Sequence, residues 1–435
     1  MTPAHPSKLR SVGARGALLF SSLLGVLAWS RPARALQPLE VFVRGARAQS
    51  PGNREAAATS AAAEARASES FGHALPGLSA SAAYTRNQWN VEFGGLAVLP
   101  QNEWDAAVAV SVPLIDLAKF ARISSAERSA DAAAQRQEAT AREIEAQVVQ
   151  QYYQLAADVA LVQVARNALE AVRANLRVTE EAARAGTVTS LDVQRATVEV
   201  ERQNQQLINA ELEVKVVARA LASQTGVVAD TAGEAALADD LHVEPGVEQF
   251  QATAPQTPAV RAAILDRAAA ERAATGQRLA LVPALNGAAS ERYTNAVGFL
   301  GGHHTAWAGG LSLVWALDFS TAPAIRARNA EAAAARAREE QTRLTIGDAI
   351  FRTWHGIEAG IARSRSARNQ AAVSARAAEV ARTRYRAGAG TQLELIQADR
   401  DAFAAQAGLI QADADLLNSR AQLRLLSGAS TTEPR

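Results

Sequence analysis

A long internal repeat constrains the fold of this 435-residue chain more than any other feature. Arg184-Ala-Gly186 recurs 202 residues later as Arg386-Ala-Gly388, and Gly226 recurs as Gly428 at the same interval. Near the start of each copy the interval lengthens to 207 residues, and the difference falls within residues 76–112. Loops tolerate such length changes, so a loop is expected there. One structural unit of about 180 residues therefore occurs twice.

Each copy ends in two segments that predict very long helices. Neither glycine nor proline occurs in residues 114–185 or 187–225, and apolar residues recur there every seven positions, as in coiled coils. A helix of about 65 residues would be roughly 100 Å long, too long to fold around one globular core. The apolar seams comprise Val148, Leu155, Val162, Leu169, Leu176 and Ala183, then Val193, Val200, Leu207, Val214 and Leu221, and in the second copy Leu395, Ala402, Leu409, Leu416 and Leu423.

The joint between the paired helices predicts an antiparallel hairpin in each copy. Gly186 and Gly388 can adopt the positive φ that ends a helix, and a threonine follows near the start of the next helix. Before the long helices, alternating apolar residues beginning at Trp104 and at Trp307 predict strands with one apolar face. These two strands align at an interval of 203 rather than 202 residues, which predicts a one-residue bulge or slip before the helices, the alternative being that one strand face is misassigned.

The first 35 residues have the pattern of a secretory signal peptide. Lys8, Arg10 and Arg15 precede a short apolar run over residues 16–29, and Ala33-Arg34-Ala35 supplies the small-x-small cleavage pattern. A spanning helix needs about 20 apolar residues, and neither this run nor any later segment free of charges is that long. The sequence therefore predicts an exported protein and excludes a helical membrane protein.

Composition excludes several other classes. The absence of cysteine excludes disulfides, thiolate metal sites, cysteine nucleophiles and an N-terminal lipid anchor. The 45 basic and 44 acidic residues nearly cancel, so a nucleic-acid partner is not indicated. Neither a P-loop, a dinucleotide fingerprint nor a Ser/His/Asp order stands out, which predicts a protein without enzymatic activity, cofactor or metal.

The repeat divides the chain into successive segments. Residues 227–255 contain acidic residues, glycine and proline without a clear period, as expected of a linker. The predicted organisation is a signal peptide at 1–35, a first repeat at 36–226 with strands near 76–116 and a hairpin near 117–226, the linker at 227–255, a second repeat at 256–428 with strands near 283–318 and a hairpin near 319–428, and a tail at 429–435.

This organisation, with the hairpin tips beginning Arg184-Ala-Gly-Thr-Val-Thr-Ser-Leu-Asp and Tyr385-Arg-Ala-Gly-Ala-Gly-Thr-Gln-Leu-Glu, resembles the TolC-like outer-membrane efflux protein family. The resemblance implies a mainly α fold with a β-barrel portion: a homotrimer with a 12-stranded outer-membrane barrel and a periplasmic α-helical tunnel. It further implies an exit duct for tripartite efflux or type I secretion. The partners would be a periplasmic adaptor protein, an inner-membrane pump and outer-membrane lipid.

The resemblance also assigns a gate at the periplasmic end. Glu394 matches an acid that forms a ring, Tyr385 matches a linking tyrosine, and Asp192 matches its partner acid. Gly390 and Gln397 depart from the arginine and second acid of some relatives, which implies a weaker latch. The alternative is that Asp192 and Glu394 only stabilise helix starts, where a carboxylate is favourable.

Other candidate residues lie at the tips and strand ends. A predicted external loop contains His303-His304, for which a solvated turn is favoured over a metal site.

The main alternative function is a periplasmic coiled-coil adaptor or scaffold, although paired strands between the rods would then have no purpose. The predicted adaptor-docking residues are Arg184, Gly186, Thr187, Leu191, Arg386, Gly388 and Leu393, and the predicted membrane-interface residues are Trp89, Trp104, Trp307 and Trp315.

Overall fold

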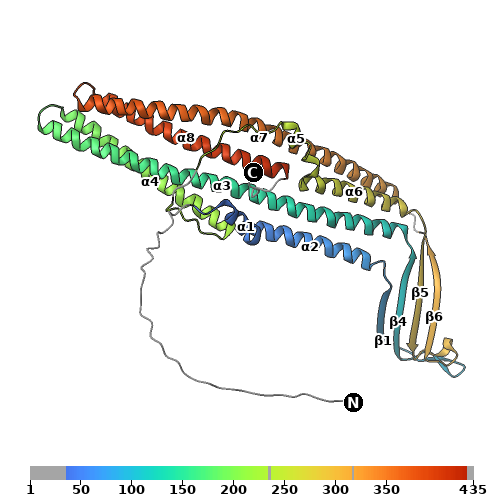
Figure 1. Cartoon of the computed structure of the whole chain (residues 1–435). Coiled ribbons are helices and arrows are strands. Elements are labelled where there is room, and N and C mark those ends of the chain that lie inside the picture. The colour runs from blue at the N-terminus through green and yellow to red at the C-terminus, as the bar shows by residue number, and fades with distance from the viewer. Residues whose placement is uncertain (1–35, 234–236, 316–317, 429–435) are drawn as a thin grey trace, which may run out of the picture.

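The computed structural model describes residues 36–233, 237–315 and 318–428. Within these residues the chain is an elongated rod, with a four-stranded sheet at one end and two helical hairpin tips at the other (Figure 1). The predicted signal peptide and C-terminal tail lie outside the described residues. None of the described helices is long and apolar enough to cross a membrane.

The predicted long helices and hairpins are confirmed. Helix α3 (Leu117–Arg184) is followed by α4 (Ser190–Thr225), and α7 (Thr321–Arg386) by α8 (Gln392–Ser427). The bounds of α4 and α8 differ by the repeat interval of 202 residues at both ends. Several residues of the predicted apolar seams are buried, among them Val148, Leu155, Val162, Leu169, Leu221, Leu416 and Leu423.

Shorter helices complete the helical wall. Helix α1 (Leu39–Gln49) leads into α2 (Pro51–Gly72), while α5 (Val247–Gln251) and a 3-10 turn (Ala254–Gln256) precede α6 (Pro258–Leu279). Helix α3 contacts α2 and α4 on one flank and α6 and α8 on the other, and α7 contacts α6 and α8 (Figure 1). The wall therefore runs from α2 and α4, through α3, to α6 and α8, and ends at α7.

The sheet has the same lateral order as the helices. Strands β1 (Gly77–Arg86), β4 (Asn102–Ile115), β5 (Ala284–Thr294) and β6 (Thr305–Val314) are antiparallel in the order β1-β4-β5-β6. The order agrees because α2 leads into β1, β4 into α3, α6 into β5 and β6 into α7. Strands β1 and β6 are the edges of the sheet, as α2 with α4 and α7 are the edges of the wall.

The predicted irregularity in β4 is confirmed. Pro113 lies opposite Asn286 and Ile115 opposite Leu285, so Leu114 is the additional residue of a bulge. The sequence analysis did not predict a short β-hairpin in the loop between β1 and β4. It consists of β2 (Val91–Phe93) paired with β3 (Leu96–Leu99). Its Gly94-Gly95 turn has two positive φ values, and only this short turn signals the hairpin in the sequence.

The strand register separates the two faces of the sheet. Directly opposed residues share a face, so Leu78, Val110 and Ala289 form one row and Tyr84 lies beside Trp104. The face that carries these residues is mostly apolar, with Glu291 as an exception. The opposite face carries mostly small or polar residues. The apolar face carries Leu78, Tyr84, Trp104, Val108, Val110, Tyr293, Trp307 and Leu311, and the polar face Ser79, Ser81, Asp105, Ser111, Asn286, Ser290, Arg292 and Ser312.

The connection between the repeats is fastened to the wall by buried charges. Arg420 of α8 donates from Nε to Asp239 Oδ2 (2.8 Å) and from Nη2 to the His242 carbonyl (2.6 Å), and it also pairs with Glu244. All but His242 are buried. The segment predicted as a plain linker is therefore packed, because its acids meet an arginine that lies far away in the sequence.

Replacing Arg420 should destabilise the helical wall. Arg420→Ala would leave the buried carboxylate of Asp239 without the guanidinium that it pairs with and would remove the same cation from beside Glu244, and we expect a loss of about 3–5 kcal/mol in the free energy of unfolding. Thermal unfolding followed by the helical circular dichroism signal measures it. Arg376→Ala, at an exposed arginine of α7, should change this free energy by less than about 0.5 kcal/mol. Equal behaviour of the two variants would contradict the assignment.

Candidate channel site

The two hairpin tips have the same local structure. Gly186 (φ 74°) and Gly388 (φ 70°) follow the last residues of α3 and α7, and open space surrounds the position of a Cβ at each. In the first tip, Thr187 N–H donates to the Ala182 carbonyl (3.0 Å), and Ala389 N–H makes the equivalent bond in the second. These are Schellman helix ends. Leu191 and Leu393 are half-exposed beside the tips, on α4 and α8.

Both candidate gate acids belong to capping boxes. Asp192 accepts from the Thr189 backbone N–H (3.1 Å) and hydroxyl (2.8 Å), and Glu394 accepts from the Thr391 N–H (3.3 Å). The hydrogen bonds from Thr189, side chain first and backbone second, lower the pKa of Asp192. Each acid thus stabilises the start of its own helix. Glu394 is nevertheless exposed.

Within one chain, Tyr385 contacts Thr179 of α3, and its expected link to a neighbouring chain stays a prediction. The Tyr385 hydroxyl lies 3.3 Å from Oγ1 of Thr179, which is buried and also donates to the Asn175 carbonyl (2.9 Å). Asp192 forms its own capping box instead of contacting Tyr385 within the chain. Tyr385 does join the second hairpin to the first, but through α3 rather than the start of α4.

A second connection between the hairpins was missed in the sequence. Glu199 of α4 is buried and accepts from Arg400 Nε of α8 (2.9 Å) as well as from Arg202 and Gln203 of its own helix. Burial would raise the pKa of Glu199, but the hydrogen bonds from Arg202, Arg400 and Gln203 outweigh it and lower the pKa to about 2. An acid beside the apolar seam of α4 is the only sequence signal for this contact.

The tryptophans lie near the ends of the strands. Trp89 is exposed in the loop after β1, and Trp104 packs on Tyr84 with ring centroids 4.7 Å apart. At the helical end of the sheet, Trp315 donates from Nε1 to the Leu281 carbonyl (3.0 Å). Trp307 is exposed on the apolar face near the other end. Exposed apolar side chains that the sequence analysis missed accompany Trp315 at the joint between sheet and helices, namely Leu117, Phe120, Leu281, Val282 and Phe319.

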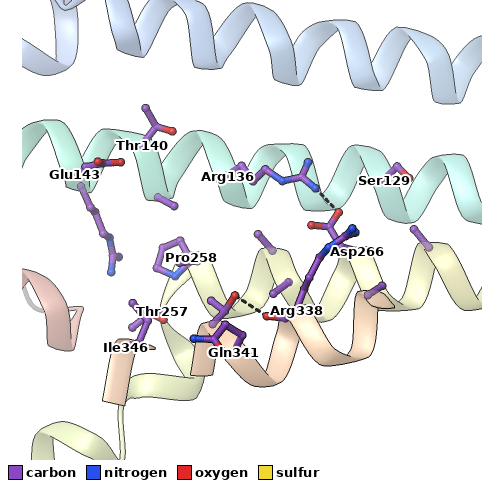
Figure 2. Close-up of a pocket in the computed structure, with 18 of the residues that line it drawn as sticks. Ser129, Arg136, Thr140, Glu143, Thr257, Pro258, Asp266, Arg338, Gln341 and Ile346 are labelled. Atoms are coloured by element: carbon purple, nitrogen blue, oxygen red, sulfur yellow. Dashed lines mark hydrogen bonds and ion pairs between the residues drawn. The ribbon is translucent and has the colours of Figure 1, made fainter. Parts of the chain in front are cut away.

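A cavity lies in the helical wall, where α8 ends and α6 begins. It measures about 1190 Å³ and is bounded by α3, α6, α7 and the end of α8. Figure 2 shows Arg136 of α3 reaching Asp266 of α6 across it, and these side chains form an ion pair. Its lining is otherwise rich in alanine. The cavity lies at the gap between the end of α8 and the start of α6, which follow one another along the wall. It is therefore a packing gap and not a site built from converging free polar groups.

The histidine pair lies in the loop between β5 and β6. His303 is exposed, and His304 Nδ1 lies 3.1 Å from the Thr294 carbonyl while its ring packs near Tyr293. Within the described ranges, histidine and acidic side chains nowhere gather in a group that could hold a metal ion.

The Glu199 contact predicts a pH-dependent contribution to stability. The folded pKa lies below the ordinary value of 4.5, so the contribution is complete above pH 4.5 and is lost as pH falls to about 2. Glu199→Gln should therefore lower the thermal midpoint at pH 7, and its difference from the unchanged protein should shrink between pH 4.5 and 2. Glu201→Gln, an exposed neighbour on α4, is the control. A difference that stays constant across this range would contradict the ion pair.

Comparisons with known proteins agree with this architecture. The outer-membrane channel OprN is 23% identical, with a TM-score of 0.79 and 91% of each chain covered. The outer membrane protein VceC of Vibrio cholerae is 18% identical, with a TM-score of 0.78, 90% of this chain and 96% of the other covered. The Campylobacter jejuni CmeC outer membrane channel is 16% identical, with a TM-score of 0.79 and coverages of 98% and 96%. These structures share the fold, whereas curated protein sequences give no significant match.

The family comparison covers both repeats. Residues 43–227 and 251–429 match the outer membrane efflux protein family, and the gap between them falls in the connection that Arg420 fastens. The match favours a channel over a coiled-coil adaptor or scaffold, and the family is one of channels rather than enzymes. With its strands at one end and its long hairpins reaching into the periplasm, the chain belongs to the outer membrane efflux protein family and is an outer-membrane efflux channel.

Proposed function

We propose that three copies of this chain form the exit duct of a tripartite efflux or type I secretion system. An inner-membrane pump would deliver substrate through a periplasmic adaptor to the helical tunnel, and the barrel would release it outside. The observation that carries the proposal is that the sheet and the helical wall end at the same two edges. Strands β1 and β6 each have one unpaired side, and α4 and α7 border the wall on the corresponding sides.

A ring of copies would pair the edges of the sheet and of the helical wall together. Unpaired strand groups cost several kcal/mol each in lipid, so an open four-stranded sheet cannot remain in a bilayer. Pairing β6 of one copy with β1 of the next closes the sheet, and twelve strands are the number implied by the family. The apolar face with Trp104 and Trp307 would contact lipid, and the polar face with Asp105 and Arg292 would line the lumen.

The narrow end of the tunnel would be gated by the hairpins. Tyr385 with Thr179, and Arg400 with Glu199, would hold the second hairpin against the first. Glu394 is exposed at the start of α8, so three copies near a threefold axis would form an acidic ring that favours cations. Asp192 would contribute indirectly, by fixing the start of α4.

The tips would dock the adaptor. They contain Gly186 and Gly388, each with open space around its Cβ position, flanked by the half-exposed Leu191 and Leu393, and this open surface would receive an approaching helical hairpin. Arg184 and Arg386 end the preceding helices, and Thr187 closes the first tip, so the three would frame the contact.

Assembly can be tested on the solubilised protein. Since the strands cannot close alone, we expect a particle with three times the mass of the processed chain in detergent. Light scattering coupled to size-exclusion chromatography measures the protein mass after correction for detergent. A stable monomer with full strand content would contradict the proposal.

The gate can be tested by separating closure from charge. Tyr385→Phe combined with Glu199→Gln removes the Tyr385 hydroxyl contact and the Glu199–Arg400 ion pair near the tips, and we expect higher single-channel conductance in a planar bilayer. Glu394→Gln keeps a side chain that can complete the capping box, so it should weaken cation preference without loosening the helix start. Thr342→Ala, on an α7 hydroxyl that bonds only its own helix, serves as the control. Unchanged conductance and selectivity in both gate variants would place the constriction elsewhere.

A further inference from the structure

The internal repeat provides a way to locate the contact between copies. A shift of 202 residues carries α4 onto α8 at both ends, and Gly186 onto Gly388. Residues 119–184 of α3 therefore have equivalents on α7, and each residue of α8 has one on α4. Within the chain, α3 packs against α8. The equivalent pair, α7 and α4, lies at the two opposite edges of the wall, so this packing could recur only between copies.

The contact inside the chain is apolar in its central part. Val149 of α3 is fully buried and clusters with Ala421 and Leu425 of α8, each 7% exposed. Beside them, Gln422 Nε2 donates to the Ala146 carbonyl (2.8 Å). These contacts fix both the register of the two helices and the faces that meet.

The equivalent residues at the edges are exposed and differ in chemistry. Val149 corresponds to Phe351, which is 51% exposed, and Ala146 corresponds to Asp348. Ala421 corresponds to Arg219 on α4. Arg219 and Asp348 are both exposed, and neither side chain forms an ion pair among the residues that the structure describes.

We propose that α7 of one copy packs on α4 of the next in the register that α3 has on α8, so that Arg219 meets Asp348 and the Phe351 ring of its neighbour. This inference rests on the proposed trimer and specifies its interface. The guanidinium would pair with the carboxylate and lie against the ring face, an arrangement favoured once water is excluded.

The change from an apolar to a charged contact has a physical reason. The contact between α3 and α8 forms as the chain folds and stays buried, whereas the surfaces of α4 and α7 face water until the copies meet. Opposite charges also select the partner surface. Two α4 edges would oppose Arg219 to Arg219, and two α7 edges would oppose Asp348 to Asp348. Only the head-to-tail contact that closes a ring joins unlike charges.

Cysteine crosslinking tests the register, because the chain contains no cysteine of its own. Arg219→Cys with Phe351→Cys should form disulfides between copies under mild oxidation, giving dimers and trimers on a non-reducing gel. Each single variant should give none. The equivalent internal pair, Val149→Cys with Ala421→Cys, should crosslink without any increase in mass. A trimer by light scattering in which only the internal pair crosslinks would overturn this register while leaving the proposed function intact, and a monomer would overturn both.

Charge reversal tests the chemistry independently of crosslinking. Arg219→Glu and Asp348→Arg should each speed dissociation of the trimer in detergent about tenfold or more, and the double variant should return the rate to within about twofold. Arg173→Glu, at an exposed arginine on the central helix α3, should leave the rate unchanged. A double variant no better than the worse single variant would overturn the pairing of Arg219 with Asp348.

Discussion

The unpaired backbone groups along the outer sides of β1 and β6 are the constraint on which the rest of the structure depends. In water such edges can be hydrated, but in a bilayer each free N–H or C=O must find a protein partner. Because every strand of the sheet continues into or out of one helix of the wall, an edge strand also fixes an edge helix. Closure of the sheet and closure of the wall are thus one event.

The internal repeat allows the same helix packing to be used within one chain and between chains. Helices α4 and α8 have the same length, and the two hairpins have matching Schellman ends, so the packing of the first unit against the second can be repeated between the second unit and the first unit of another chain. The duplication is not perfect. The β4 bulge at Leu114 and the hairpin between β1 and β4 occur in the first unit, and the 3-10 turn at Gly298–Leu300 packs on β3 of that hairpin.

Buried charges join parts of the chain that the apolar seams leave separate. Arg420 holds the connection between the repeats, and Glu199 with Arg400 holds the two hairpins together near their tips. A coiled-coil seam fixes helices along their length but tolerates sliding by a heptad, whereas an ion pair at one level does not. Breaking either pair would leave a buried charge, so these positions resist separation more strongly than alanine contacts would.

The sequence by itself determined the elements and their duplication. Heptad spacing over Val148, Leu155 and Val162 requires a long helix with one buried stripe, glycine at 186 and 388 permits the helix ends, and strand alternation marks the sheet. All of these are local patterns. A one-residue bulge or slip before the helices could also be predicted, because the two copies of the strand differ in alignment by one residue, and the structure places the bulge at Leu114. Only the tertiary structure decided which side chains meet across the repeats. Within one chain, Tyr385 contacts Thr179, Glu199 contacts Arg400, and Asp239 contacts Arg420. The spacing of residues along one helix determines the face on which a side chain lies. The residue that it contacts on another helix depends on the axial register of the two helices, and packing along the whole length of the rod sets that register.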